Sequence, residues 1–154
     1  MHIQIQDKNE LVNYVNSLID SNSKQLSILA NVTSLIKSCF IDASWVGFYL
    51  FDKNDNSLYL GPFQGDLACE YIPFGKGVCG TCLKEKKSQL VKDVNAIKNH
   101  IACSDLTQSE LVVPIIKDDQ VVAVIDLDSY KLAYFTIKDQ KLIEDVAKQL
   151  EKIF

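Results

Sequence analysis

Two apolar segments near the end of the chain restrict its fold more than any other feature. Residues 111–116 and 121–127 are rich in β-branched side chains, and four polar residues, 117–120, separate them. This pattern predicts two strands joined by a tight hairpin. Residues 44–51 and about 57–60 predict a second hairpin, because turn-forming Asp and Asn side chains lie between them. We therefore expect an antiparallel sheet.

Helical periodicity surrounds these strands. Apolar residues recur every three or four positions over about 11–19 and 26–40, a short helix is predicted over 78–86, and a longer one over about 136–154 with Thr136 as its N-cap. Helices at both ends of hairpin-connected strands, without β-α-β alternation, predict an α+β domain. The expected fold is a central antiparallel sheet flanked by N-terminal and C-terminal helices, and residues 1–154 are expected to form a single domain.

Charge and hydropathy exclude several classes of function. The chain has 154 residues, a net charge of −4 and no strong basic cluster, which disfavours nucleic acid and anionic membranes as partners. No apolar segment has the length of a membrane span, and the N-terminus lacks a secretory signal. We expect a cytoplasmic protein. In that reducing compartment, its five cysteines suit catalysis, metal binding or burial better than a disulfide framework.

Cys103 is one candidate for a reactive thiol. It follows His100 by three residues within a polar, irregular segment, where a nearby imidazole or helix N-terminus could lower the pKa of the thiol. The alternative is a small apolar side chain packed under the loop. Position alone does not decide between the two.

Cys79 and Cys82 form Cys-Gly-Thr-Cys, which has the spacing of a dithiol redox motif. The parallel β-α-β context of thioredoxin-like proteins is missing, so packing inside a helix is the favoured interpretation. A zinc site that combines this pair with His100 and Cys103 is disfavoured, because two close ligand pairs are not present, and we expect no metal. Cys39 is expected to be buried.

Acidic side chains end one of the strong strands. Asp126 and Asp128 are two residues apart, so they point to the same face of a strand. Shared burial and like charge would raise the pKa of at least one of them and leave a proton to donate near neutral pH. Glu110, at the start of the neighbouring strand, joins them if the hairpin register allows. Exposure at a strand end is the alternative.

Aromatic residues dominate one face of the first strand. Trp45, Gly47 and Tyr49 alternate along it, and the glycine leaves a gap between the two rings. Such a gap can admit a ligand, although ordinary core packing explains aromatic strand residues more often.

Seven short segments together resemble the free methionine-(R)-sulfoxide reductase family, whose members are single GAF domains. The similar segments are Trp-Val-Gly-Phe-Tyr at 45–49, Leu-Gly-Pro-Phe-Gln-Gly at 60–65, Ala-Cys-Glu-Tyr-Ile at 68–72, Gly-Lys-Gly-Val-Cys-Gly at 75–80, His-Ile-Ala-Cys at 100–103, Ser-Glu-Leu-Val-Val-Pro at 109–114 and Asp-Leu-Asp-Ser at 126–129. The combination is far more specific than any single motif.

The resemblance implies a role for each matched residue. Cys103 becomes the nucleophile, Cys69 the resolving thiol and Cys79 a further redox cysteine. The substrate would be bound by the carboxylates around the sulfoxide and by the wall near its methyl end: Glu110, Asp126, Asp128, Trp45 and Tyr49. Two departures from the family pattern are Cys82, in place of a small residue without a thiol, and Ile-Lys-Asn at 97–99, in place of Phe-Pro-Gly.

The implied reaction reduces free methionine-(R)-sulfoxide. The Cys103 thiolate attacks the sulfoxide sulfur while a carboxyl group protonates the oxygen, which leaves methionine and a sulfenic acid. Cys69 then forms a disulfide that thioredoxin reduces, so thioredoxin is the expected partner and no bound cofactor is needed. The alternatives are a non-catalytic GAF sensor of a small ligand and a broader thiol reductase or peroxidase centred on Cys79 and Cys82. The oligomeric state stays open, a homodimer being one option.

Overall fold

A computed structural model describes residues 7–20, 22–98 and 104–154. Six strands form a single sheet in the order β3-β2-β1-β6-β5-β4, and every neighbouring pair is antiparallel. The strands are β1 (Ala43–Asp52), β2 (Ser57–Gln64), β3 (Tyr71–Pro73), β4 (Gln89–Val91), β5 (Ser109–Lys117) and β6 (Gln120–Ser129).

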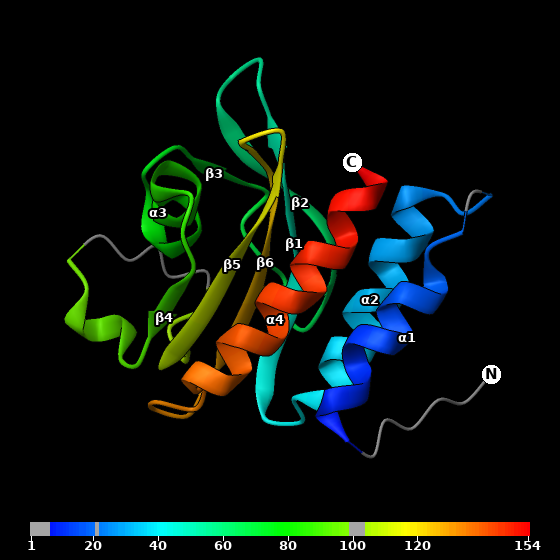
Figure 1. The fold of residues 1–154 in the computed structure, drawn as a ribbon. Coiled ribbons are helices and arrows are strands. Elements are labelled where there is room, and N and C mark those ends of the chain that lie inside the picture. The colour runs from blue at the N-terminus through cyan, green and yellow to red at the C-terminus, as the bar shows by residue number, and fades with distance from the viewer. Residues whose placement is uncertain (1–6, 21, 99–103) are drawn as a thin grey trace.

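Helices cover both faces of the sheet (Figure 1). One face carries α1 (Leu11–Leu18), α2 (Gln25–Cys39) and α4 (Ile137–Leu150), and the other carries the shorter α3 (Gly77–Glu85). Short 3-10 helices lie at Lys8–Glu10, Val94–Ala96 and Glu151–Ile153. The predicted α+β class and its flanking helices are confirmed.

The predicted hairpin between β5 and β6 forms with a two-residue turn. Lys117 pairs with Gln120, and Asp118 and Asp119 between them adopt positive φ angles of 49° and 60°. Both central residues of a type I′ turn need this left-handed conformation, which Asp tolerates better than most residues. Thr136 is confirmed as the N-cap of α4, in a capping box with Asp139.

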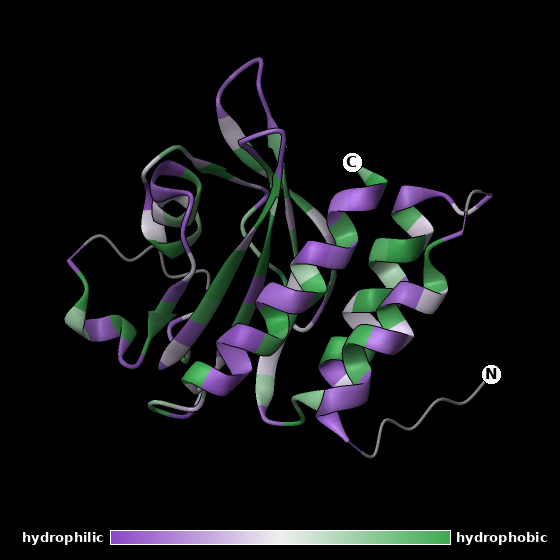
Figure 2. Ribbon diagram, viewed as in Figure 1, coloured by the Kyte–Doolittle hydropathy of each residue, from purple (hydrophilic) through white to green (hydrophobic). Residues whose placement is uncertain are grey.

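Alternation along the strands divides the interior into two cores. Val46, Phe48, Leu111 and Ile125 pack against α1, α2 and α4, and these helices turn their apolar sides to the sheet (Figure 2). The intervening residues face α3 and form a smaller core with polar members at one end. That polar end is where the candidate active site lies.

A β-bulge at the start of β1 sets which residues reach this second face. Ala43 pairs with Ser129 and Trp45 with Asp128, so two residues of β1 advance against one residue of β6. As a result, Ala43 packs in the larger core, whereas Trp45 lies on the α3 face. The bulge thus directs the Trp45 ring toward the polar end of the smaller core.

The structure differs from the sequence prediction at the sheet edges. The three-residue strands β3 and β4 carry too little pattern to be recognised. Strand β2 runs to Gln64, four residues beyond its predicted end, because it pairs with β1 on one side while β3 covers only its first three residues. Pro62 is tolerated there because the outer edge at that point has no neighbouring strand that needs its amide.

The end of another segment also differs. The last α-helix ends at Leu150 and continues as a 3-10 turn over Glu151–Ile153. Cys69 lies in the irregular connection between β2 and β3. Within the described residues, no helix is both long enough and apolar enough to cross a membrane.

Candidate active site

A cavity of about 50 Å³ opens on the α3 face of the sheet. Its floor is formed by β1, β5, β6 and the start of α3, and its mouth by the β2–β3 connection and the residues after β6. The lining residues are Ser44, Trp45, Tyr49, Asp66, Leu67, Ala68, Ile72, Gly77, Val78, Cys79, Ser104, Glu110, Asp126, Asp128 and Tyr130. The structure therefore brings together six of the eight residues that the sequence selected, which are Trp45, Tyr49, Cys79, Glu110, Asp126 and Asp128.

Three carboxyl groups meet at the base of this cavity because of the strand register. Glu110 of β5 lies directly opposite Asp128 of β6, and Asp126 lies opposite Gly47 of β1. Glu110 and Asp126 are each only 6% exposed. The alternative of acids exposed at a strand end is therefore wrong for these two residues.

Burial governs the protonation of the three carboxyl groups. Removal from water raises the pKa of Glu110, Asp126 and Asp128 well above the usual range, and the negative charge of a neighbouring carboxylate raises each further. Because two charged carboxylates this close repel each other strongly in a buried site, the cluster retains at least one proton when solvated acids have lost theirs.

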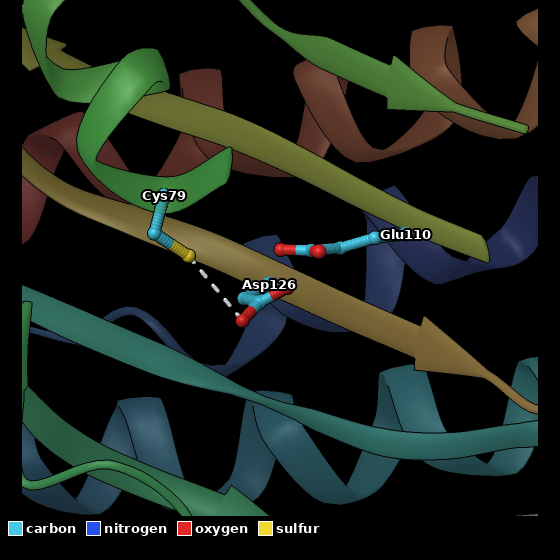
Figure 3. Close-up of side chains that lie close together, drawn as sticks. All are labelled: Cys79, Glu110 and Asp126. Carbon is cyan, nitrogen blue, oxygen red and sulfur yellow. Dashed lines mark hydrogen bonds between the residues drawn. The ribbon is translucent and has the colours of Figure 1, made fainter. Parts of the chain in front are cut away.

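Cys79 contacts this cluster from the first turn of α3 (Figure 3). Its thiol donates a hydrogen bond to Oδ2 of Asp126 over 3.3 Å. The sulfur of Cys79 and one oxygen each of Glu110 and Asp126 lie within 4.8 Å of one another, which is close enough for a metal ion to bind all three. The thiol proton is, however, already engaged with Asp126, so an acid–thiol hydrogen bond describes this group.

Aromatic rings form one wall of the cavity. The Trp45 ring stacks on Tyr49 at 5.8 Å between centroids and on Phe63 at 5.3 Å. A Cβ atom at Gly47 would lie 2.4 Å from the Trp45 ring and 2.5 Å from Cβ of Phe63. The gap expected at Gly47 is therefore filled by Trp45 itself, and the ligand space lies beside the rings.

The same wall holds the connection that carries Cys69. Nε1 of Trp45 donates to the carbonyl oxygen of Asp66, and the Tyr49 hydroxyl donates to the carbonyl oxygen of Cys69. The Tyr130 hydroxyl donates to Oδ2 of Asp66 from the segment after β6. Three side chains thus fix residues 66–69 at the mouth of the cavity.

The four cysteines among the described residues differ in oxidation state. Cys69 is disulfide-bonded, whereas Cys39, Cys79 and Cys82 are free thiols. Cys79 and Cys82 are both buried, and burial raises the pKa of each, with a further increase from Asp126 and Glu110. Cys39 is only partly buried at the end of α2.

Cys103 and His100 lie outside the described residues. Ser104, which follows Cys103 directly, lines the cavity.

Several lining residues were not selected from the sequence. Ser44 contributes a buried hydroxyl oxygen that, among the described residues, has no hydrogen-bond partner. Asp66 and Tyr130 approach each other from segments 64 residues apart. Each of the three directly adjoins a segment that resembles the reductase family, and this adjacency was the signal available for finding them.

Comparison with known proteins identifies the family. Residues 27–154 match the family model of the GAF domain. The chain is 39% identical over 138 residues to free methionine-R-sulfoxide reductase of Escherichia coli, covering 90% of this chain and 82% of that protein. It is 44% identical over 141 residues to the enzyme of the same name from Saccharomyces cerevisiae, covering 88% and 78%. The chain belongs to the free methionine-R-sulfoxide reductase family of GAF-domain proteins.

A solved structure extends the similarity within this reductase family. The free methionine-R-sulfoxide reductase from Neisseria meningitidis, determined in complex with its substrate, superposes with a TM-score of 0.93 at 40% identity and covers 100% of this chain and 94% of that one. The family membership and the GAF-type fold expected from the sequence are confirmed.

Proposed function

We propose that this protein reduces free methionine-(R)-sulfoxide to methionine. The observation that carries the proposal is the cluster of the buried Glu110 and Asp126 with the half-buried Asp128, which lines a cavity walled by Trp45 and Tyr49. Family relatives named for the same activity support it. The sulfoxide oxygen must be protonated before it can leave the substrate sulfur, so the reaction needs an acid beside the substrate, and the cluster supplies carboxyl groups that keep a proton at pH values where solvated acids have lost theirs.

The first step is nucleophilic substitution at sulfur. The Cys103 thiolate attacks the sulfoxide sulfur, and a carboxyl group of the cluster donates its proton to the oxygen. The new bond between the two sulfur atoms then breaks as the protonated oxygen passes to Cys103, which becomes a sulfenic acid, and methionine leaves with its sulfur reduced. The aromatic wall of Trp45 and Tyr49 would contact the methyl end of the substrate.

The second step protects the oxidised cysteine. The Cys69 thiolate attacks the sulfur of the sulfenic acid, a disulfide forms, and hydroxide leaves and takes up a proton as water. The disulfide-bonded state of Cys69 supports its part in this step. Thioredoxin would return both thiols by disulfide exchange, and no bound cofactor is required. Such a cycle suits the reducing cytoplasm.

Recognition of the free amino acid follows from charge. Free methionine sulfoxide carries an ammonium and a carboxylate, whereas a residue inside a peptide carries neither. Carboxylates of the cluster can pair with the ammonium, and backbone amides of the surrounding loops can bind the carboxylate. A peptide-bound sulfoxide would leave these groups unpaired, which disfavours it.

A coupled assay tests the proposal. The protein, thioredoxin, thioredoxin reductase and NADPH are combined with free methionine-(R)-sulfoxide, its S epimer or a peptide-bound sulfoxide, and NADPH oxidation is followed. We expect oxidation with the free R epimer and little with the other two. Equal consumption of all three substrates, or no consumption of the R epimer, would contradict the proposal.

Cysteine variants separate this function from its rivals. Cys103→Ser should abolish turnover, whereas Cys82→Ser should leave it largely intact. A thiol reductase centred on the Cys79–Cys82 pair would give the opposite result for Cys82→Ser. A GAF sensor would bind methionine sulfoxide without producing methionine in either the original protein or its variants.

A further inference from the structure

Cys79 has surroundings that do not suit a redox thiol. It is 3% exposed and lies against two carboxyl groups (Figure 3). A cysteine in the first turn of a helix usually has a lowered pKa, because the helix dipole favours the thiolate. Here burial and the charges of Asp126 and Glu110 act in the opposite direction, and they prevail, so the pKa of Cys79 is raised. The thiol therefore keeps its proton.

That proton has a defined acceptor. The thiol donates to Oδ2 of Asp126 over 3.3 Å, whereas Oδ1 of Asp126 is buried and has no partner at hydrogen-bonding distance among the residues that the structure describes. The neighbouring carboxyl group of Glu110 is the acceptor that competes with a substrate for the proton of Asp126, and it raises the pKa of Asp126. In a neutral carboxyl group, one oxygen is a hydroxyl and the other a carbonyl, and the carbonyl oxygen is the better acceptor. A donor fixed on Oδ2 thus favours the acid proton on Oδ1.

We infer that Cys79 is a positioning residue whose thiol orients Asp126, and that Asp126 is the carboxyl group that donates its proton, from Oδ1, to the sulfoxide oxygen. This inference rests on the proposed function and narrows it to one acid among three. It also replaces the redox role that the family resemblance implies for Cys79. The Cys79 thiol is not oxidised in this cycle. It holds the carboxyl group of Asp126, the proton donor, in one orientation.

Asp126 is suited to this role by its position. Its partners on the neighbouring strands are Gly47 of β1 and Val112 of β5, and it lines the cavity together with Trp45 and Cys79. Gly47 brings no side chain of its own, and the Trp45 ring folds over it. A substrate methyl group on that ring would place the sulfoxide sulfur near Asp126.

Two substitutions at Cys79 test the inference. Cys79→Ser keeps a hydroxyl donor but removes redox chemistry, whereas Cys79→Ala removes the donor. We expect Cys79→Ser to keep at least about a third of kcat, and Cys79→Ala to lose about tenfold in kcat with little change in KM, which corresponds to one lost hydrogen bond to a reacting group. Cys82→Ser is the matched control, because it alters a buried thiol one turn further along α3 without a hydrogen bond to Asp126.

Two outcomes would overturn the inference. Equal loss of activity in Cys79→Ser and Cys79→Ala would indicate a redox or purely steric role, and full activity in Cys79→Ala would show that the hydrogen bond is dispensable. Both results would leave the proposed function intact if the unaltered protein produces methionine. A protein that produces none would contradict the proposed function instead.

A measurement independent of turnover examines the thiol itself. The S–H stretching band of Cys79 should lie at a lower frequency than that of a thiol without an acceptor, should vanish in Cys79→Ser and should shift in Asp126→Asn. After oxidation by substrate, Cys79 should still react with an alkylating agent in the denatured protein. A disulfide at Cys79 in the oxidised protein would overturn the inference.

Discussion

The phenolic hydroxyl of Tyr49 donates a hydrogen bond to the backbone carbonyl oxygen of Cys69 over 3.1 Å. Tyr49 is buried on β1 and lines the cavity, whereas Cys69 lies in the connection between β2 and β3. One side chain therefore serves both the wall of the cavity and the position of the disulfide-bonded cysteine. In the proposed cycle, this links the site of sulfoxide reduction to the site of disulfide formation.

Removing that hydroxyl should separate the two steps. Tyr49→Phe keeps the ring but loses a hydrogen bond of about 1 kcal/mol, so disulfide formation should slow roughly fivefold. The methionine released in a single turnover without reductant should be unchanged, and a sulfenic acid trap should capture more product. Tyr59→Phe is the control, since its hydroxyl bonds to Asp55 away from the cavity. An unchanged rate of disulfide formation would show that the contact has no role in this step.

Cys82 is the cysteine that departs from the family pattern, and the structure gives it a packing role. Its side chain is fully buried among the residues of the smaller core. We expect Cys82→Ala to keep kcat within about twofold while the free energy of unfolding falls by roughly 1 kcal/mol, as for other small losses of buried volume. Denaturant unfolding and the coupled assay measure the two quantities. Loss of activity without loss of stability would assign Cys82 to the chemistry.

Sequence periodicity was enough to find the acids but not to align them. Asp126 and Asp128 share a face because strand side chains alternate. If the strand pairing continued without a bulge from the Lys117–Gln120 pair, Glu110 would lie opposite Leu127. The β-bulge between Ile115 and Ile116 shifts the register by one residue, and Glu110 then lies opposite Asp128. A bulge of this kind depends on packing across the whole hairpin, so the sequence left the position of Glu110 open.

Contacts between distant segments were beyond prediction for a different reason. The hydrogen bond from Cys79 to Asp126 joins residues 47 positions apart and depends on how α3 is seated on the sheet. Likewise, the Trp45 ring fills the space over Gly47 and stacks there on Phe63 of β2. Helix and strand patterns specify which face a residue occupies, but the rotamer it takes there is decided by neighbours from other elements.

The start of α4 offers a test of stability away from the cavity. Thr136 and Asp139 form a capping box, and Lys8 pairs with Asp139 at 3.0 Å. Burial alone would raise the pKa of Asp139, but the hydrogen bonds from Thr136 and Lys8 outweigh it and lower the pKa. The carboxylate therefore stabilises the fold above the pKa of the unfolded chain, and this contribution is lost as the pH falls through the folded-state pKa.

Thr136→Ala should accordingly lower the free energy of unfolding by about 1 kcal/mol at neutral pH. The difference in the free energy of unfolding between the variant and the original protein should shrink in acid, because Asp139 is then protonated in both proteins. Urea unfolding at a series of pH values measures this, and activity in the coupled assay should be unaffected. A deficit independent of pH would mean that the threonine acts without its charged partner.

Asp126→Asn should show that the acid cluster lowers stability. The folded-state pKa of Asp126 is raised by burial and then by Glu110, so the native protein holds a proton that the unfolded chain releases above about pH 4. Stability therefore falls as the pH rises from that value toward the folded-state pKa. The neutral amide removes this cost, and the variant should be roughly 1–2 kcal/mol more stable at neutral pH with a shallower decline. Turnover should fall at least about a hundredfold, because the amide has no acid proton to donate.

Asp145→Asn, at an exposed position of α4, is the control and should change neither the free energy of unfolding nor the turnover. A less stable Asp126→Asn protein at neutral pH would show instead that the charged carboxylate is well stabilised where it lies.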